Sequence, residues 1–256
     1  MSYLSDLVTA TRKRLEQSRG VLNEATLEQR IASQDPPKGL RAALLAETPS
    51  VIAEIKRRSP SKGPLDLGLD AAALARAYAD GGAAAISVLT EPEAFEGSLD
   101  DLRAARGAGL PVLRKDFILD EFQILESRAE GADAVLLIVR AVGRDLERLV
   151  KATSALGMDA LVEVFDEADL DLALEVDADL IGINHRDLET FEVHPTRTAE
   201  LAPRIPEPKT VVALSGVATR REVEELVASG ARSLLIGESL VTAPDPAAKL
   251  RELLGR

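Results

Sequence analysis

Eight short apolar runs recur along the chain, and this recurrence restricts the fold more than any other feature of the sequence. Stretches of helical period separate the runs, which return roughly every 20 to 35 residues, as strands do in strand–helix units. Many runs are apolar throughout, as the strands of a parallel sheet are when both faces are buried. The runs cover residues 51–55, 84–89, 111–114, 134–139, 160–164, 180–184, 210–214 and 233–237.

Similar turn signals precede four of these runs. Gly82, Gly131 and Gly230 lead into the next run, and a glycine there supplies the left-handed residue that ends a helix. Segment 176–179 holds the same place without a glycine. We interpret the pattern as a diverged internal repeat. Eight strand–helix units in 256 residues predict an α/β protein with a (β/α)8 TIM barrel, and an open doubly wound sheet is the alternative.

The residues before the first run predict a helical extension. Amphipathic patterns cover 4–17 and 24–33, and a proline-containing break follows at 35–39. The first pattern lacks the apolar core of a signal peptide. We therefore expect residues 1–256 to form a single barrel domain, with residues 1–47 as an N-terminal extension packed on it.

Composition excludes several classes of function. The chain has no cysteine, which removes disulfides, thiolate nucleophiles and iron–sulfur clusters, and fits a cytoplasmic protein. The net charge of −12 argues against a nucleic-acid partner, and no apolar run approaches the roughly 18 residues of a membrane span. His185 and His194 lack the spacing of a metal pair, so we expect no metal and interpret both as loop residues.

Charged residues gather where the predicted strands end, which is where barrel enzymes place their reactive groups. Glu54 and Lys56 lie two residues apart on the first strand and share a face, which is unfavourable in a buried strand unless the two charges are paired. Lys115 ends the third strand. Glu163 stands between two valines of the fifth, so it needs a partner or a raised pKa. Each could be a structural ion pair alone, but together they form a candidate catalytic set.

Other strand ends supply candidate binding residues. The sixth strand ends in Asn184, with Arg186 two residues further on. Phe117 follows Lys115 by two residues and could line the same pocket, although core packing is an equal alternative for it and for Phe95. The polar loop after the first strand contains Ser59, Pro60 and a further cation at position 62, and it could hold an anion above the strand end.

The last two strand ends predict a phosphate site. Ser215 and Gly216 follow the seventh strand, and Gly237, Glu238 and Ser239 follow the eighth. In many barrels these two loops bind phosphate through backbone N–H groups. Since the eighth strand of a closed barrel neighbours the first, the phosphate would lie beside the loop after the first strand.

These segments together resemble the indole-3-glycerol-phosphate synthase family of tryptophan biosynthesis. The resemblance extends from about residue 50 to the C-terminus, and the motifs occur in the family's order. They are VIAEIKRRSPSKG at 51–63, SVLTE at 87–91, FEGS at 95–98, PVLRKDF at 111–117, LVEV at 161–164, INHRDL at 183–188 and IGES at 236–239.

The resemblance implies a lyase that closes the indole ring of 1-(2-carboxyphenylamino)-1-deoxyribulose 5-phosphate with loss of CO2 and water. No cofactor or metal is implied, and we expect a monomer. Lys115 would be the general acid, Glu163 the second acid or base, and Glu54 the group that orients Lys115. The implied binding residues are Lys56 near the carboxylate and phosphate, Asn184 and Arg186 along the sugar, Ser59, Ser215, Gly216, Gly237, Glu238 and Ser239 at the phosphate, and Pro60, Phe95 and Phe117 at the anthranilate ring.

Two positions depart from the family pattern. Leu214 stands where the family usually has an active-site glutamate, and His185 stands where asparagine is usual. We expect the His185 side chain to face away from that of Asn184. The alternative to an active synthase is therefore a phosphate-ligand-binding barrel of the same family with impaired catalysis at Leu214.

A different phosphosugar enzyme is a further alternative. A sugar isomerase of the same pathway would be expected to use a cysteine, which the chain lacks. A Schiff-base aldolase would need a reactive lysine, a role open to Lys115 or Lys56.

Overall fold

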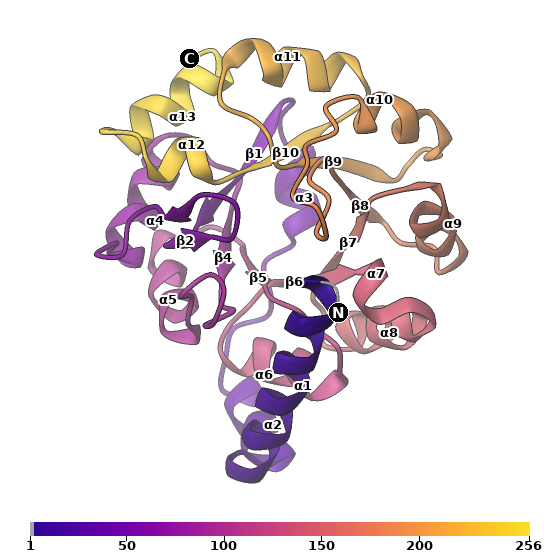
Figure 1. The fold of residues 1–256 in the computed structure, drawn as a ribbon. Helices are drawn as coiled ribbons and strands as arrows, with labels where there is room; N and C mark the ends of the chain where they lie inside the picture. Colours follow the sequence, from indigo (N-terminus) through magenta and orange to yellow (C-terminus); the bar gives the residue numbers. More distant parts are fainter. Residues whose placement is uncertain (1–2) are drawn as a thin grey trace.

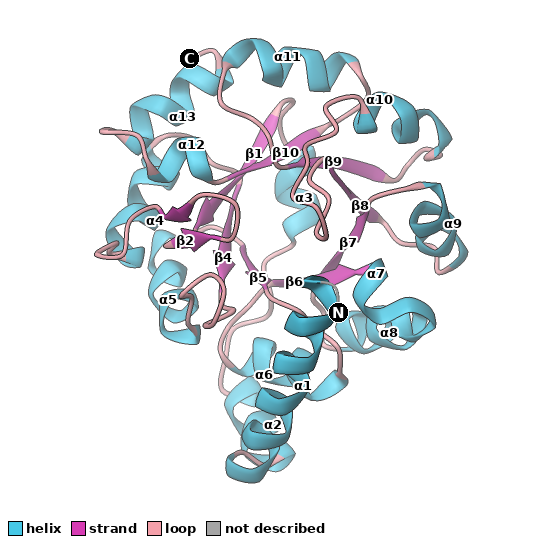
Figure 2. Cartoon of the chain, viewed as in Figure 1, coloured by secondary structure: helices cyan, strands magenta, loops and turns pink. Residues whose placement is uncertain are grey.

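The structure is a computed structural model that describes residues 3–256, and its core is a closed barrel of eight parallel strands (Figures 1 and 2). Around the barrel the strands follow the order β1-β10-β9-β8-β7-β6-β5-β4, and β1 pairs with both β4 and β10. The strands are β1 Ser50–Ile55, β4 Ala85–Leu89, β5 Val112–Lys115, β6 Ala134–Ile138, β7 Asp159–Val164, β8 Leu180–Asn184, β9 Thr210–Leu214 and β10 Ser233–Ile236. The predicted barrel is confirmed, and the open sheet is excluded.

Helices surround the barrel, and a small hairpin of β2 Arg58–Ser59 and β3 Gly63–Pro64 follows β1. The helices are α1 Tyr3–Val21, α2 Glu24–Ala32, α3 Leu40–Leu45, α4 Ala71–Asp80, α5 Leu99–Ala105, α6 Glu121–Ala129, α7 Val139–Val142, α8 Leu146–Ala155, α9 Glu167–Glu175, α10 Arg197–Leu201, α11 Arg220–Ala228, α12 Glu238–Val241 and α13 Pro246–Leu254. Within residues 3–256, no helix is long and apolar enough to cross a membrane.

The predicted left-handed residues occur between helices and strands. Gly82, Gly131 and Gly230 have φ angles of 90°, 92° and 105°. Asp177, at the place without a glycine, has a φ of 57°. Aspartate is one of the few residues with a Cβ that tolerate this region, so the repeat persists where the glycine is absent.

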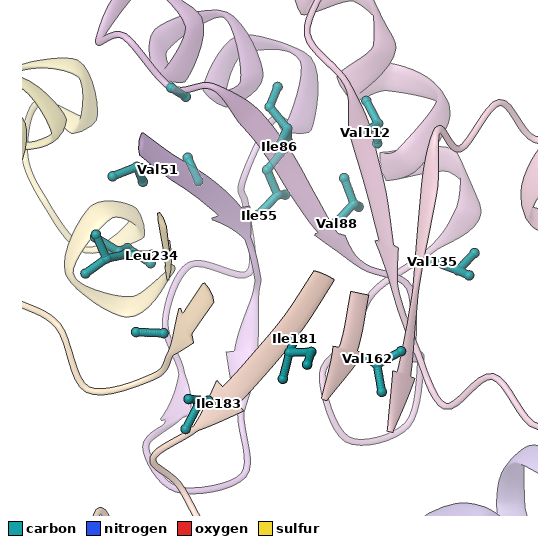
Figure 3. Close-up of a cluster of buried hydrophobic side chains, with 14 of the residues drawn as sticks. Val51, Ile55, Ile86, Val88, Val112, Val135, Val162, Ile181, Ile183 and Leu234 are labelled. Atoms are coloured by element: carbon teal, nitrogen blue, oxygen red, sulfur yellow. The ribbon is translucent and has the colours of Figure 1, made fainter. Parts of the chain in front are cut away.

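Alternation along the strands divides the apolar core into two layers. Outward side chains such as Val51 and Ile55 pack between the strands and the surrounding helices (Figure 3). Inward side chains fill the barrel. They include Ile52, Ala85, Leu113, Ala134, Leu136, Leu161, Leu180, Val212, Leu214 and Leu235. Glu54 lies on the inward face, two residues beyond Ile52, and this places its charge directly above the apolar filling.

The N-terminal extension contacts both ends of the barrel. Leu40 and Leu44 of α3 are fully buried in the inner cluster, and the Leu44 carbonyl accepts a hydrogen bond of 3.0 Å from Ser50 at the start of β1. Leu7 of α1 belongs to the same cluster but lies at the opposite end, beside Phe117. The two predicted helices are therefore confirmed, and α3 is a third that the sequence did not predict.

We expect Leu44→Ala to destabilise the protein by about 2–5 kcal/mol, because it leaves a cavity under the barrel filling. Leu45 is the matched control, since it is the next residue of α3 and is 39% exposed. Leu45→Ala should change the free energy of unfolding by only about 0.5 kcal/mol. Urea unfolding of both variants measures the difference, and equal losses would contradict this description of α3.

Candidate active site

A cavity of about 620 Å³ opens at the carboxyl ends of the strands. Of the sixteen site residues predicted from the sequence, fourteen line it, and Glu163 and Leu214 lie outside its lining. The fourteen are Glu54, Lys56, Ser59, Pro60, Phe95, Lys115, Phe117, Asn184, Arg186, Ser215, Gly216, Gly237, Glu238 and Ser239. Strand ends far apart in the sequence thus share one concave surface, as expected for a barrel enzyme.

Glu54 joins two lysines at the base of this cavity. Its carboxylate lies 2.8 Å from Lys115 Nζ and 2.6 Å from Lys56 Nζ, and its side chain is almost fully buried. Burial alone would raise the pKa of Glu54, but the two ammonium groups outweigh it and hold the pKa at about 2. The predicted pairing of Glu54 with Lys56 is confirmed, and the carboxylate stays ionised at neutral pH.

Lys115 stays protonated in spite of its burial. Burial disfavours the ammonium, but the carboxylates of Glu54 and Glu163 outweigh this effect and raise the pKa of Lys115. A buried cation that faces the cavity can donate a proton to a bound ligand. The ammonium group of Lys115 is therefore available as a proton donor beside the cavity.

Glu163 lies next to the main cavity, in a smaller pocket that shares Asn184 and Arg186 with it. Burial raises the pKa of Glu163, and Lys115 and a hydrogen bond of 2.9 Å from Asn184 Nδ2 oppose the rise only in part. This confirms that an acid between buried valines has both a partner and a raised pKa. A carboxyl whose pKa is shifted towards neutrality suits proton transfer.

Asn184 and Arg186 form the wall beside Glu163. The Asn184 amide donates to Glu163, and its Oδ1 accepts a hydrogen bond of 3.0 Å from the Arg186 backbone N–H, so its orientation is fixed. The Arg186 guanidinium donates a hydrogen bond of 3.0 Å to the Phe191 carbonyl. Arg186 therefore also holds its own loop.

Gly237 stands against Glu54 because β10 pairs with β1. A Cβ at this position would overlap the Glu54 carboxylate, so only glycine leaves room for it. The next residue, Glu238, is 4.0 Å from Lys62 of the hairpin loop. The Ser239 hydroxyl donates a hydrogen bond of 2.8 Å to the Val217 carbonyl, which connects the loops after β9 and β10.

Leu214 points into the barrel below the cavity. It is 1% exposed, pairs in register with Asn184 and fills the space beside Gly182. The chain then turns sharply, since Ser215 and Gly216 have φ angles of 69° and 82°. This left-handed turn brings both residues into the cavity wall, while the Leu214 side chain remains part of the apolar filling.

The cavity lining also includes residues that were not predicted, and some of them lie far from the predicted strand ends. Tyr3 and Leu7 come from α1, Leu188 and Phe191 from the loop after β8, and Lys249 from α13. The Tyr3 and Phe191 rings meet edge to face at 4.8 Å and close one side of the cavity. Leu7 could have been indicated by the apolar stripe of the first predicted helix. The other residues named here lie outside any periodic pattern, so the sequence carries no comparable signal for them.

Residues 3–256 contain no group of three or more His, Cys, Asp or Glu side chains arranged to hold a metal ion.

Comparison with known proteins identifies close relatives of the whole chain. A family model described as Indole-3-glycerol phosphate synthase matches residues 4–253. A protein of that name from a Nocardioides species is 47% identical over 100% of this chain and 99% of its own. Indole-3-glycerol phosphate synthase 2 of Streptomyces coelicolor is 47% identical over 98% of each chain.

Solved structures show a more distant likeness in the fold alone. Thiamine phosphate pyrophosphorylase from Pyrococcus furiosus superposes with a TM-score of 0.61 at 16% identity, over 85% of this chain and 96% of that chain.

Glu54 should make the stability of the protein depend on pH in acid. Its pKa falls from 4.5 in the unfolded chain to about 2, so its contribution is fully present above pH 4.5 and is lost as the pH falls through 2. The contribution is on the order of 3 kcal/mol. Glu54→Gln should be less stable at pH 7 and lose correspondingly less stability between pH 4.5 and 2, as measured by urea unfolding.

Glu28→Gln is the control for this experiment, because Glu28 is exposed on α2. It should retain the acid dependence of the original protein. If Glu54→Gln retains it as well, Glu54 is not the group responsible.

Proposed function

Because this chain belongs to the indole-3-glycerol phosphate synthase family, we propose that it closes the indole ring of 1-(2-carboxyphenylamino)-1-deoxyribulose 5-phosphate, with release of CO2 and water. The observation that carries the proposal is the arrangement at one barrel end of a protonated Lys115, its partner Glu54, and Glu163 with a raised pKa. Ring closure and dehydration both need proton transfer, and these groups can supply it.

Ring closure begins when the ring carbon that bears the carboxylate attacks the ribulose carbonyl carbon. The carbonyl oxygen gains negative charge during the attack, and Lys115 donates a proton to it. Glu54 fixes the position of the ammonium group at 2.8 Å. Loss of CO2 then returns the bonding electrons to the ring and restores its aromaticity. Lys56 lies on the other carboxylate oxygen of Glu54, where it can attract the substrate carboxylate before it leaves.

Dehydration follows. The former carbonyl oxygen leaves as water once it is protonated again, and a proton is lost so that the indole double bond can form. Glu163 serves as the acid or base of this step, because burial raises its pKa above that of an ordinary glutamate and its carboxyl lies beside Asn184 in the cavity wall. Asn184 holds the Glu163 carboxylate and borders the sugar.

The two ends of the substrate differ in chemistry, and the cavity differs in the same way. Pro60, Phe95 and Phe117 offer an apolar wall for the anthranilate ring. The loops after β9 and β10 carry the residues for the phosphate, which are Ser215, Gly216, Gly237, Glu238 and Ser239, with Ser59 opposite. Lys56 and Arg186 supply local positive charge in a protein whose net charge is −12.

The same proposal includes a small molecule as the only partner. A net charge of −12 is unfavourable for binding nucleic acid, and a chain without cysteine suits the reducing cytoplasm. We accordingly propose a cytoplasmic monomer that needs no cofactor.

Leu214 favours a second function, a barrel that binds the phosphate ligand with impaired catalysis. Its side chain is apolar and fully packed, so it brings no carboxylate to the cavity where the family usually has one. Substrate would then bind without turnover.

Lys115→Ala should lower kcat by about 10²–10⁴-fold, because it removes the proton donor. Binding should persist, since the phosphate and ring walls are unchanged. The measurement is the indole fluorescence that develops after addition of the carboxyphenylamino ribulose phosphate. Lys151→Ala, at an exposed lysine of α8, is the control and should keep full activity. A lysine-to-alanine variant at 115 with full turnover would exclude the proposed acid.

Leu214→Glu decides between the two functions. If the unmodified chain binds substrate without product and the variant gains indole fluorescence, the binding function is correct. If the unmodified chain turns over substrate and the variant leaves kcat within about twofold, Leu214 does not limit catalysis. Unfolding of the variant in urea must be followed in parallel, because a buried carboxylate can lower stability.

A further inference from the structure

We propose that His185 is a positioning residue that holds the end of β9, so that the Ser215–Gly216 turn keeps the conformation that receives the substrate's phosphate. The inference rests on the proposed function, because it assigns the phosphate to this turn. His185 does not line the cavity and touches no part of the proposed substrate. It acts through the backbone of the neighbouring strand.

The His185 ring ties two successive backbone carbonyls. Its Nδ1 lies 3.0 Å from the Leu214 carbonyl oxygen and 3.2 Å from that of Ser215. A carbonyl oxygen can only accept, so Nδ1 carries the proton and donates to both. On the far side of the ring, Nε2 lies 2.8 Å from the Thr198 hydroxyl of α10. Burial lowers the pKa of His185, and the neutral ring then accepts the Thr198 proton at Nε2.

The backbone of His185 strengthens the same connection. Its N–H donates a hydrogen bond of 3.1 Å to the Leu214 carbonyl, which therefore accepts from both the ring and the backbone of one residue. Its own carbonyl accepts a hydrogen bond of 2.7 Å from the His194 N–H. His185 is 2% exposed and its ring lies between the end of β9 and α10, while the preceding Asn184 faces Glu163. The expectation that the two side chains face apart is confirmed.

The turn that follows needs such a restraint. Ser215 has a φ of 69°, in the left-handed region that is unfavourable for a residue with a Cβ. Backbone of this kind persists only where its surroundings fix it, and it is concentrated at functional sites. The bond from His185 Nδ1 to the Ser215 carbonyl fixes the peptide between Ser215 and Gly216. The Gly216 N–H belongs to that same peptide, so its direction depends on His185.

Leu214 explains why the restraint comes from a neighbouring strand. Its side chain has no polar atom, so it cannot form a hydrogen bond that orders the end of β9. His185 and Leu214 are in direct contact through the His185 ring and the Leu214 carbonyl. The His185 ring thus supplies the polar side-chain contact that Leu214 cannot supply, and it holds the Ser215–Gly216 turn at the end of β9.

The test is His185→Leu, which keeps a buried side chain of moderate size and removes both ring bonds. We expect KM and the inhibition constant of inorganic phosphate to rise about tenfold, whereas kcat changes less than about twofold. The inhibition constant of anthranilate, a probe for the ring end, should stay the same. Nitrogen-15 NMR of the ring should also show the proton on Nδ1 in the unmodified protein. A ring protonated at Nε2, or unchanged phosphate inhibition in the leucine variant, would overturn the proposal.

Two further variants exclude a purely structural effect. His194→Leu removes the other histidine of the same loop, whose ring contacts Phe165 at 5.5 Å and does not reach β9. It should leave phosphate inhibition unchanged. His185→Asn can donate one hydrogen bond and should raise the phosphate constant about threefold, and it decides the question if the leucine variant does not fold. A fall in kcat and stability with unchanged phosphate inhibition would assign His185 to packing alone.

A failure of the proposed function is distinguishable from a failure of this inference. If the unmodified chain makes no indole product, the synthase assignment fails. Phosphorus-31 NMR titration of the unmodified protein and of His185→Leu with inorganic phosphate then tests the turn directly. Weaker phosphate binding in the variant supports the positioning role, and equal binding overturns it.

Discussion

The ionised Glu54 carboxylate between two ammonium groups is the interaction on which the site depends. A buried carboxylate is unfavourable alone, and so is each of the partly buried lysines. Joined at 2.6 and 2.8 Å, they hold one negative and two positive charges above the apolar barrel filling. The excess positive charge faces the cavity, where an anionic ligand can compensate it. The carboxylates of Glu54 and Glu163 keep Lys115 charged against the effect of burial, and the partial burial of Lys115 limits the screening of its field by water.

Most of the barrel, and of the cavity at its carboxyl end, could be predicted from the periodicity of apolar residues in the sequence. The eight predicted runs agree with the observed strands to within one residue at each end, because strands buried on both faces leave a strong signal. Parallel strands in a barrel all end on one side, so residues at the carboxyl ends of distant strands were correctly expected to lie close together. Fourteen of the sixteen predicted site residues line the cavity, and most of them follow a strand end directly, whereas Pro60 and Phe95 lie in loops and were predicted from the family resemblance.

The features that the sequence did not predict depend on contacts between elements. The helix α3 has only six residues and follows two prolines, too short for a period to be visible. Tyr3 and Phe191 come from distant parts of the chain and meet at one side of the cavity, and the sequence around either residue does not indicate this contact. His185 lies in a loop, as interpreted, but its contacts with Leu214, Ser215 and Thr198 were not predicted because these residues belong to other elements. Hydrogen bonds between distant elements leave no local pattern.

The N-terminal extension has a consequence for the order of assembly. Its first helix borders the cavity and its third helix fills the base of the barrel, so one continuous segment contacts both ends of the barrel (Figure 1). Leu40 and Leu44 share a cluster with Leu235 near the other end of the chain. This segment is synthesised before β10, and its burial cannot be complete until β10 has joined the barrel. Until β10 has joined the barrel, the apolar faces of α1 and α3 are exposed and can aggregate with other chains. The addition of β10 therefore completes the burial of these helices.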